Sequence, residues 1–175
     1  MEYVDIYNSH REKTGIVREK GADLAHGEYI CIAHLVIFNS KDEMLIQKRA
    51  ANKELWAGYW DISAGGGVTS GETPVETAMR ETFEELGVCI DLIEQRPMLT
   101  IYYPIGFDDY FIVERDIPLH SILAQQEEVS EVKWADKENI LQMTKEGTFV
   151  HYKHGFIELL FALKGNRGSY DYIRK

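Results

Sequence analysis

The sequence predicts a mixed α/β fold, an α/β sandwich in which helices pack on a β-sheet. Runs rich in β-branched and aromatic residues alternate in mixed order with helical patterns along the chain. The 175 residues are 45% hydrophobic, which is enough to form a sizeable core. No repeat, low-complexity tract or long linker divides the chain, so we expect one main domain.

The first third of the chain predicts an arm followed by a β-hairpin. Residues 1–28 are polar with short apolar pieces, and we interpret them as an N-terminal arm or hairpin. The main domain is expected to span 29–175. Residues 30–38 and 44–47 are rich in β-forming side chains, and a turn-forming sequence separates them, so they predict a hairpin.

The rest of the chain continues the alternation of strands and helices. Residues 56–67 are aromatic and then glycine-rich, which is typical of a loop with one short strand. A helix is predicted over 74–86, where apolar residues recur at near-helical spacing. The remaining predictions are strands at 89–94, 98–103, 110–114 and 131–134, a turn-rich bend at 104–109, a helix after Asp136 as N-cap, and a helix over 149–163.

The charge balance excludes some classes of partner. The chain has 19 Lys and Arg against 29 Asp and Glu, a formal net charge of −10. This acidity argues against a protein that coats a nucleic-acid duplex and against a polybasic membrane-surface protein. A small anionic substrate remains compatible, because a bound cation can invert the local field.

Localisation is also constrained by the apolar segments. The longest apolar stretches fall far short of the roughly 20 residues that cross a bilayer, and the first residues have no apolar targeting core. Cys31 and Cys89 lie in apolar segments without CxxC spacing, which predicts two buried, reduced thiols. We therefore expect a cytoplasmic protein with no membrane partner. A homodimer formed through the N-terminal arm stays open.

The helix over 74–86 carries clear start and stop signals. Thr73 is a good N-cap, Pro74 occupies the first helical position, and Glu76 completes a capping box. Gly87 follows as the expected C-terminal stop. The apolar stripe that this helix is expected to bury consists of Val75, Met79, Phe83 and Leu86.

Three carboxylates of the same helix point in one direction. At about 100° per residue, Glu81, Glu84 and Glu85 fall within a single narrow arc. Their mutual repulsion and their place in the last helical turns are both unfavourable. Clustered oxygen ligands of this kind suggest a divalent cation, and a solvated acidic face is the alternative.

The spacing around these carboxylates resembles the Nudix box, G-x5-E-x7-R-E-U-x-E-E-x-G-U, where U is a bulky apolar residue. The match runs from Gly66 through Glu72 to Val88 and departs at Thr82, where the family prefers an aliphatic residue. The compatible strand pattern extends the resemblance over roughly residues 29–163. It implies the Nudix fold, an α/β/α sandwich around a mixed β-sheet.

The resemblance also implies a metal site. Glu84 and Glu85 would be the principal ligands of Mg²⁺, with Mn²⁺ as the alternative cation, and the carbonyl of Gly65 would complete the shell. In family members another carboxylate often comes from a downstream loop, where Glu128 is the better candidate. An ordinary exposed acidic loop is the other interpretation of that segment.

The remaining box positions take catalytic and positioning roles in this resemblance. Glu81 would bind a second metal ion or act as general base on the attacking water, a role that the downstream carboxylate could also take. Arg80 would hold the carboxylates through salt bridges, and Glu72 would anchor the loop to the helix.

Substrate contacts are predicted outside the box. Arg49 and Lys53 are candidates for phosphate contacts, or else serve surface solubility. Tyr103 belongs to an aromatic group that could stack on a flat part of the substrate, and a plain hairpin core is the alternative. The resemblance to the Nudix family implies a small anionic diphosphate as partner.

A second set of residues lies before the box: Phe38-Asn39, Gln47-Lys48-Arg49, Lys53, Trp56 and Gly58-Tyr59-Trp60. With them, residues 15–60 resemble isopentenyl-diphosphate isomerase, a relative with the Nudix fold. That enzyme needs a cysteine and a histidine where this chain has Gly65 and Gly67, and His26 and His34 do not match its metal-ligand spacing. The predicted function is therefore a metal-dependent hydrolase that cleaves a diphosphate linkage in a nucleoside diphosphate joined to another group. The alternatives are an isomerase-like enzyme and a non-catalytic nucleotide-binding domain.

Overall fold

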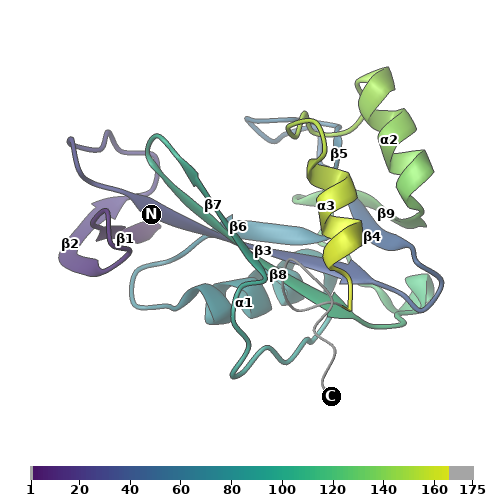
Figure 1. Ribbon diagram of the computed structural model, residues 1–175, viewed down its shortest axis with the longest axis horizontal. Helices are drawn as coiled ribbons and strands as arrows, with labels where there is room; N and C mark the ends of the chain where they lie inside the picture. Colours follow the sequence, from purple (N-terminus) through teal and green to yellow (C-terminus); the bar gives the residue numbers. More distant parts are fainter. Residues whose placement is uncertain (1, 166–175) are drawn as a thin grey trace, which may run out of the picture.

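The computed structural model describes residues 2–165 and forms the α/β/α sandwich around a mixed sheet that the sequence predicts (Figure 1). Helix α1 (Pro74–Leu86) packs on one face of the sheet, and α2 (Lys137–Glu146) and α3 (Phe156–Leu163) lie on the other. A short 3₁₀ helix, η1, spans Leu119–Ser121. The strands are β1 (Tyr3–Tyr7), β2 (Lys13–Glu19), β3 (Ile30–Phe38), β4 (Met44–Arg49), β5 (Trp60–Asp61), β6 (Ala64–Gly67), β7 (Leu99–Tyr103), β8 (Gly106–Glu114) and β9 (Val129–Ala135).

The main sheet is built around two long central strands. Strand β3 runs parallel to β8 over its full length, whereas the order β5-β4-β3-β8-β7 is otherwise antiparallel. Strands β3 and β4 pair at a single register position, Phe38 with Met44, and then diverge. Beyond that point β6 takes the edge of β3, while β5 and β9 pair with β4. The sheet therefore divides beside β6, the strand that leads toward α1.

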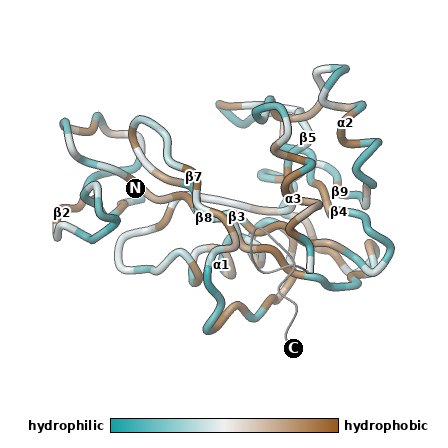
Figure 2. The backbone as a smooth tube through the Cα atoms, in the orientation of Figure 1, coloured by the Kyte–Doolittle hydropathy of each residue, from teal (hydrophilic) through white to brown (hydrophobic). Residues whose placement is uncertain are grey.

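Successive side chains of the central strands point to opposite faces of the sheet, so the molecule has two apolar cores. Odd-numbered residues of β3, such as Ala33 and Leu35, pack with Ala78 and Leu86 of α1. Even-numbered residues, such as Val36, pack against α3. Figure 2 shows the hydrophobic colouring concentrated on these central strands and on α3, with hydrophilic colouring on the outer loops.

A two-stranded hairpin of β1 and β2 lies at the end of the sheet nearest β7. Its strands pair antiparallel, and Tyr7 bridges to Tyr29 just before β3. The side chain of Arg11, at the tip of the hairpin, forms an ion pair of 2.6 Å with Asp109 of β8. The same guanidinium donates to Thr100 of β7 and covers the ring of Phe107. This one side chain thus fastens the hairpin to two strands of the main sheet.

Several predicted elements differ from the structure. Residues 89–94 form no strand; Asp91 caps a turn there by accepting from the amide of Ile93. The bend predicted over 104–109 shrinks to a tight turn because β8 begins at Gly106. Helix α3 begins at Phe156, after Gly155 in the left-handed conformation, and residues 56–67 hold two short strands. The end of the expected 29–175 domain, 166–175, lies outside the described residues.

Of the two cysteines, only Cys31 has the predicted burial. Its side chain is buried in the core against α1, and burial raises its pKa. Cys89 is exposed just beyond α1, so the prediction of burial is wrong for this residue. No helix in the described range, 2–165, has the length and apolar character needed to span a membrane.

Candidate active site

The helix α1 begins and ends where its local sequence dictates. The hydroxyl of Thr73 accepts from the amide of Glu76, whose carboxylate accepts from the amide of Thr73, so the capping box is complete. At the other end Gly87 adopts the left-handed conformation with φ 67°, and its amide donates to the carbonyl of Phe83. These caps fix the position of the glutamates in between.

The buried face of α1 is rotated from the predicted apolar stripe. Phe83 is 56% exposed, whereas Thr82 and Glu85 are buried. The hydroxyl of Thr82 donates to the carbonyl of Ala78 at 2.7 Å, so this departure from the family pattern is accommodated within the helix. The rotation turns carboxylates toward the sheet, at the place where β3 and β4 diverge.

Arg80 gathers the carboxylates of the loop and the helix. Its guanidinium donates to Glu72 at 2.8 and 3.1 Å, and it forms ion pairs with Glu84 at 2.8 Å and with Glu81 at 2.9 Å. Burial would raise the pKa of Glu72, but hydrogen bonds from Arg80 and Thr77 bring it below its usual value. Arg80 therefore has the geometry expected of a residue that positions the site.

The glycine-rich strand β6 lies directly against Glu81. A Cβ atom placed on Gly66 would lie 2.3 Å from the Glu81 Oε1 atom, so the carboxylate of Glu81 would have to move from its position. A Cβ on Gly65 would lie 2.4 Å from His34 Nδ1. The absence of a side chain lets the backbone at Gly66 approach the Glu81 carboxylate, and at Gly65 it leaves room for the ring of His34.

Glu85 is the most deeply buried carboxylate of the helix. It is 6% exposed, and Gln47 of β4 donates to its Oε2 atom at 2.9 Å. Burial raises the pKa of Glu85 to about 8, and the negative charges of Glu81, Glu128 and Asp61 add to the rise. Burial also raises the pKa of Glu81, although Arg80 opposes it.

A second group of charged residues lies near the end of α1, where the amide of Gln125 donates to the carbonyl of Glu85 at 3.0 Å. Glu128, just before β9, forms an ion pair with Lys53. Arg49 at the end of β4 donates to the carbonyl of Leu55 at 3.0 Å and lies 3.6 Å from Asp61. Arg49, Lys53 and Glu128 line one hollow of about 600 Å³. The predicted phosphate contacts and the predicted loop carboxylate therefore share one cavity.

Tyr103 is not part of this group. It lies on β7, and its ring crosses Gly106, where a Cβ atom would come within 2.7 Å of the Tyr103 hydroxyl. The hydroxyl is buried and has no hydrogen-bond partner within residues 2–165. The structure thus places Tyr103 beside the start of β8, away from Arg49 and Lys53.

Two residues of the site escaped the sequence reasoning. Gln47 is a buried amide in the otherwise apolar first part of β4, a signal that was available in the sequence. Asp61 is a largely buried carboxylate that accepts from the Tyr152 hydroxyl at 2.6 Å. Burial raises the pKa of Asp61 despite that hydrogen bond. Its partner comes from the loop before α3, so no local pattern could have identified the pair.

The donor set fits a divalent cation. The carboxylates of Glu81, Glu128 and Asp61 each raise the pKa of Glu85, and the oxygens of all four side chains are hard ligands. As they stand, no three His, Cys, Asp or Glu side chains within 2–165 are grouped to hold an ion. Glu84 is half exposed and held by Arg80, so its side chain has room to turn. A divalent ion would neutralise the repulsion that burial makes costly.

An α/β/α sandwich in which one arginine braces glutamates of a glycine-rich loop and its following helix is the architecture of a Nudix pyrophosphohydrolase. The NUDIX domain family model matches residues 30–155. The chain belongs to the Nudix family, as its sequence indicates.

Relatives and solved structures agree with this assignment. An uncharacterized Nudix hydrolase of Listeria monocytogenes is 41% identical over 94% of this chain and 96% of its own length. An isopentenyl-diphosphate Delta-isomerase of Escherichia coli O127:H6 is 28% identical over 81% of this chain and 80% of its own length. The crystal structure of DR0079 from Deinococcus radiodurans is 25% identical, with a TM-score of 0.71, and covers 91% of this chain and 97% of that one. The relatives of this chain therefore include both Nudix hydrolases and isopentenyl-diphosphate isomerases.

Proposed function

We propose that the protein is a divalent-metal-dependent hydrolase that cleaves the diphosphate linkage of a nucleoside diphosphate joined to another group. The observation that carries the proposal is the burial of Glu85 beside three further carboxylates, with Arg80 bracing Glu81 and Glu84 from outside. This arrangement is costly for folding and is explained by the cation and substrate that it would bind. The working compartment that we propose is the cytoplasm.

Each predicted site residue has a proposed role. Glu84, Glu85 and the Gly65 carbonyl hold Mg²⁺ or Mn²⁺, with Glu128 contributing from the opposite side. When bound, the ion neutralises phosphate charge and lowers the pKa of the attacking water. Glu81, packed on Gly66, accepts the proton of that water as general base.

The positioning and binding roles follow from the same contacts. Arg80 and Glu72 keep the glycine-rich loop and the helix in fixed relation. Arg49 and Lys53 bind substrate phosphates in the hollow that they line, where Lys53 leaves Glu128 to do so. Tyr103 contacts the non-phosphate part of the substrate. Residues 1–28 form an arm distinct from the catalytic domain.

The relatives that are isomerases do not change this proposal. Gly65 stands where that enzyme needs a cysteine, and a Cβ at this position would collide with His34. Neither thiol of the chain lies in the proposed site, because Cys31 is in the core and Cys89 is exposed beyond α1. An isomerase would convert a prenyl diphosphate without releasing a phosphorylated fragment.

The test is turnover by the variants Glu84→Gln and Glu85→Gln. Each is expected to abolish Mg²⁺-dependent release of phosphorylated products from a panel of nucleotide sugars, dinucleotides, nucleoside triphosphates and prenyl diphosphates. The amides keep the shape of the side chains but lose the charge that binds a cation. Thermal unfolding in EDTA is the control, and the midpoint of Glu85→Gln should not fall below wild type, because a buried charge has been removed.

Two results would contradict the proposal. Full activity in both variants would remove the site assignment. Wild-type protein that gains thermal stability from a nucleotide ligand but releases no product with Mg²⁺ would instead be a binding domain.

A further inference from the structure

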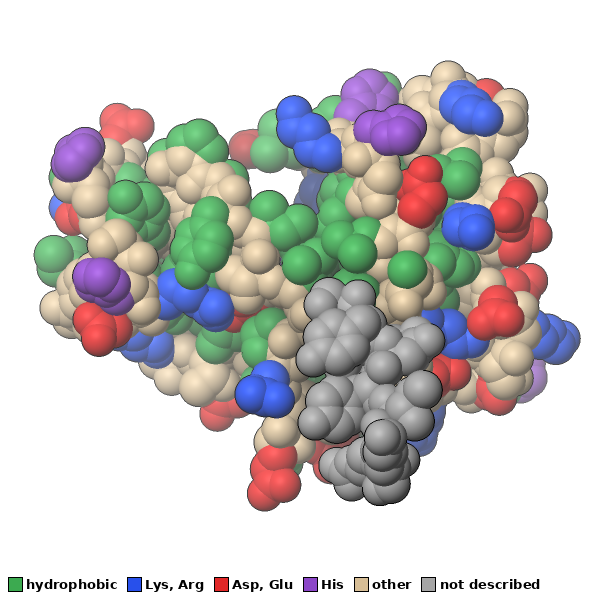
Figure 3. Space-filling view, viewed as in Figure 1, with side chains coloured by type: hydrophobic (Ala, Val, Ile, Leu, Met, Phe, Trp, Pro, Cys, Tyr) green, Lys and Arg blue, Asp and Glu red, His purple; other side chains and the backbone are tan. Residues whose placement is uncertain are grey.

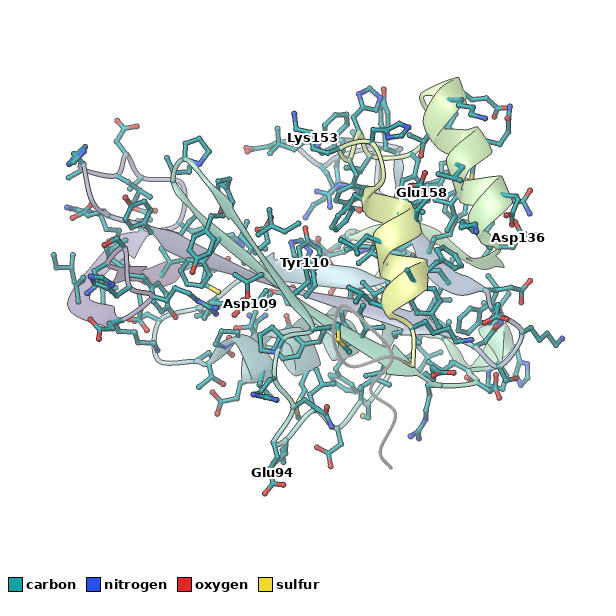
Figure 4. The ribbon with its side chains drawn as sticks, in the orientation of Figure 1. Glu94, Asp109, Tyr110, Asp136, Lys153 and Glu158 are labelled. Carbon is teal, nitrogen blue, oxygen red and sulfur yellow. The ribbon has the colours of Figure 1, made fainter. Side chains whose placement is uncertain are left out.

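A second polar cluster lies on the sheet face opposite α1, and the proposed catalytic roles do not account for it. His34 of β3 and Tyr110 of β8 are register partners, and their rings stack at 4.6 Å. His34 also pairs with Gly65 of β6 on its other side. The cluster therefore starts next to the glycine-rich strand but faces α3 instead of α1. Figure 4 shows Tyr110 on the α3 side of β8.

Asp108 is the under-satisfied member of this cluster. Its Oδ1 atom is buried and has no hydrogen-bond partner among residues 2–165; His34 Nε2 is 3.7 Å away. Its Oδ2 atom receives only a long hydrogen bond of 3.4 Å from Tyr110. The side chain as a whole remains 21% exposed, so the carboxylate can be approached. The Tyr103 hydroxyl, on the same face, is also buried and has no hydrogen-bond partner in the described part of the chain. Buried polar atoms without partners are rare and call for a ligand or another specific explanation.

The next residue in the chain has the opposite environment. Asp109 points to the α1 face of β8 and is 1% exposed. Arg11 donates to its Oδ2 atom at 2.6 Å, and Thr100 donates to its Oδ1 atom at 2.6 Å. Figure 4 shows Asp109 and Tyr110 on the two sides of this strand. The fold thus supplies two short hydrogen bonds to Asp109, which has a structural role, and only one long hydrogen bond within the described residues to Asp108.

We infer that Asp108 determines substrate specificity by accepting a hydrogen bond from an N–H or O–H group of the non-phosphate part of the substrate. The inference rests on the proposed function and names the end of the substrate that this face binds. A carboxylate accepts only, whereas Tyr103 and a histidine can donate, so the complementary ligand is a neutral group with a donor beside an acceptor. Nucleobase edges and sugar hydroxyls both have this chemistry.

The charge of Asp108 also orients the substrate. Its carboxylate repels phosphates, whereas the cationic Arg49 and Lys53 line the hollow that they share with Glu128, and Asp108 is not part of that lining. The hollow between the two halves of the molecule, visible in Figure 3, opens on the side of the sheet that α3 covers only in part. The diphosphate is thereby directed to the box, and the neutral group is directed to Asp108.

The test is a binding measurement that needs no turnover. Calorimetric titrations with Mg²⁺ would compare AMP, GMP, CMP and UMP with ribose 5-phosphate and inorganic phosphate. In wild type at least one nucleotide is expected to bind more tightly than inorganic phosphate. In Asp108→Asn this nucleotide should bind about 10-fold or more weakly, because a charged acceptor is replaced by a neutral one, while inorganic phosphate binds as before. If wild type also binds ribose 5-phosphate more tightly than inorganic phosphate, the sugar supplies the donor. If wild type binds these two ligands equally, the base supplies it.

Stability separates this role from a structural one. The unfolding midpoint of Asp108→Asn should not fall, because the long hydrogen bond from the Tyr110 hydroxyl can still be accepted by the amide oxygen of the asparagine. The matched control, Asp109→Asn, should lower the midpoint and leave the nucleotide titration unchanged, and Thr100→Val is a milder version of the same control. Tyr103→Phe should likewise weaken nucleotide binding without loss of stability.

Three results would overturn the inference: equal nucleotide affinity in Asp108→Asn and wild type, an equal loss for inorganic phosphate, or no wild-type preference for any nucleotide. Failure of the proposed function would look different. The Glu84→Gln and Glu85→Gln enzymes would then hydrolyse normally, or wild type would release no product, whatever the titrations show.

Discussion

Two adjacent glycines of β6 meet very different surroundings. A Cβ on Gly66 would lie 2.3 Å from a carboxylate oxygen of Glu81, whereas a Cβ on Gly67 would meet nothing closer than Lys20 Cε at 3.8 Å. A side chain at Gly66 would displace Glu81, the proposed general base, whereas Gly67 has room for a methyl group.

Gly66→Ala is therefore expected to lower kcat/KM by about 100-fold, since displacing a reacting group by about 1 Å has an effect of that order. Gly67→Ala is the control and should stay near wild type. Steady-state kinetics on the same substrate would check both, with thermal unfolding to show that each variant is folded. Equal kinetics for the two alanine variants would show that Glu81 is not held by this contact.

At the same scale, the sequence patterns predicted which charged residues belong to the site, but they did not predict which of these side chains are buried. The box spacing singled out Glu72, Arg80, Glu81, Glu84 and Glu85. In the structure Arg80 contacts Glu72, Glu81 and Glu84 directly. The pattern of apolar residues could not show that Glu85 faces inward and Phe83 outward. That choice depends on Gln47, which lies 38 positions away and becomes a partner only when β4 is in place.

At the scale of single elements, α1 depends on its first turn. The capping box of Thr73 and Glu76 satisfies amide groups that the helix cannot pair internally. Thr73→Ala is expected to lower the free energy of unfolding by about 1 kcal/mol. Urea denaturation would measure this change. Glu76→Gln retains an acceptor and should be close to wild type, and a similar loss in both variants would point to the charge of Glu76 instead of the cap.

Elements with complete local signals were the ones that the sequence predicted best. The bounds 74–86 agree with α1, and Asp136 is the N-cap of α2, because caps are made by nearby residues. Residues 89–94 have the composition of a strand but no neighbouring strand to pair with. The pairing of a strand is a tertiary property, so composition alone could not decide it.

At the scale of the whole molecule, Arg11 connects the N-terminal hairpin to the sheet. Among residues 2–165, removing it in Arg11→Ala leaves the buried Asp109 with Thr100 as its one side-chain donor, which should cost about 2 kcal/mol of unfolding free energy. Urea denaturation of the variant and of wild type would measure the difference. Arg11→Lys retains a charge and should lose less.

The unfolding free energy that is lost in Arg11→Ala should also depend on pH. Burial raises the pKa of Asp109 above its usual value of 3.8. The folded state therefore binds the proton up to a higher pH than the unfolded chain does. As a result, the contribution of Asp109 to stability falls as pH rises from about 3.8. Without Arg11 that pKa rises further and the fall becomes steeper. The difference between Arg11→Ala and wild type should thus be smaller at pH 4 than at pH 7, and a constant difference would show that Asp109 is not the group involved.

The separation of β3 from β4 after Phe38 and Met44 has a consequence for how the two faces communicate. In a continuous sheet, a layer of paired backbone would stand between α1 and the loop before α3. Here Glu85 enters from one face and Asp61, held by Tyr152, from the other, and their charges influence each other. The backbone pairing that would separate the two carboxylates is missing at this point. A charged group bound on the α3 side would therefore act on a cation held by Glu85 across the sheet.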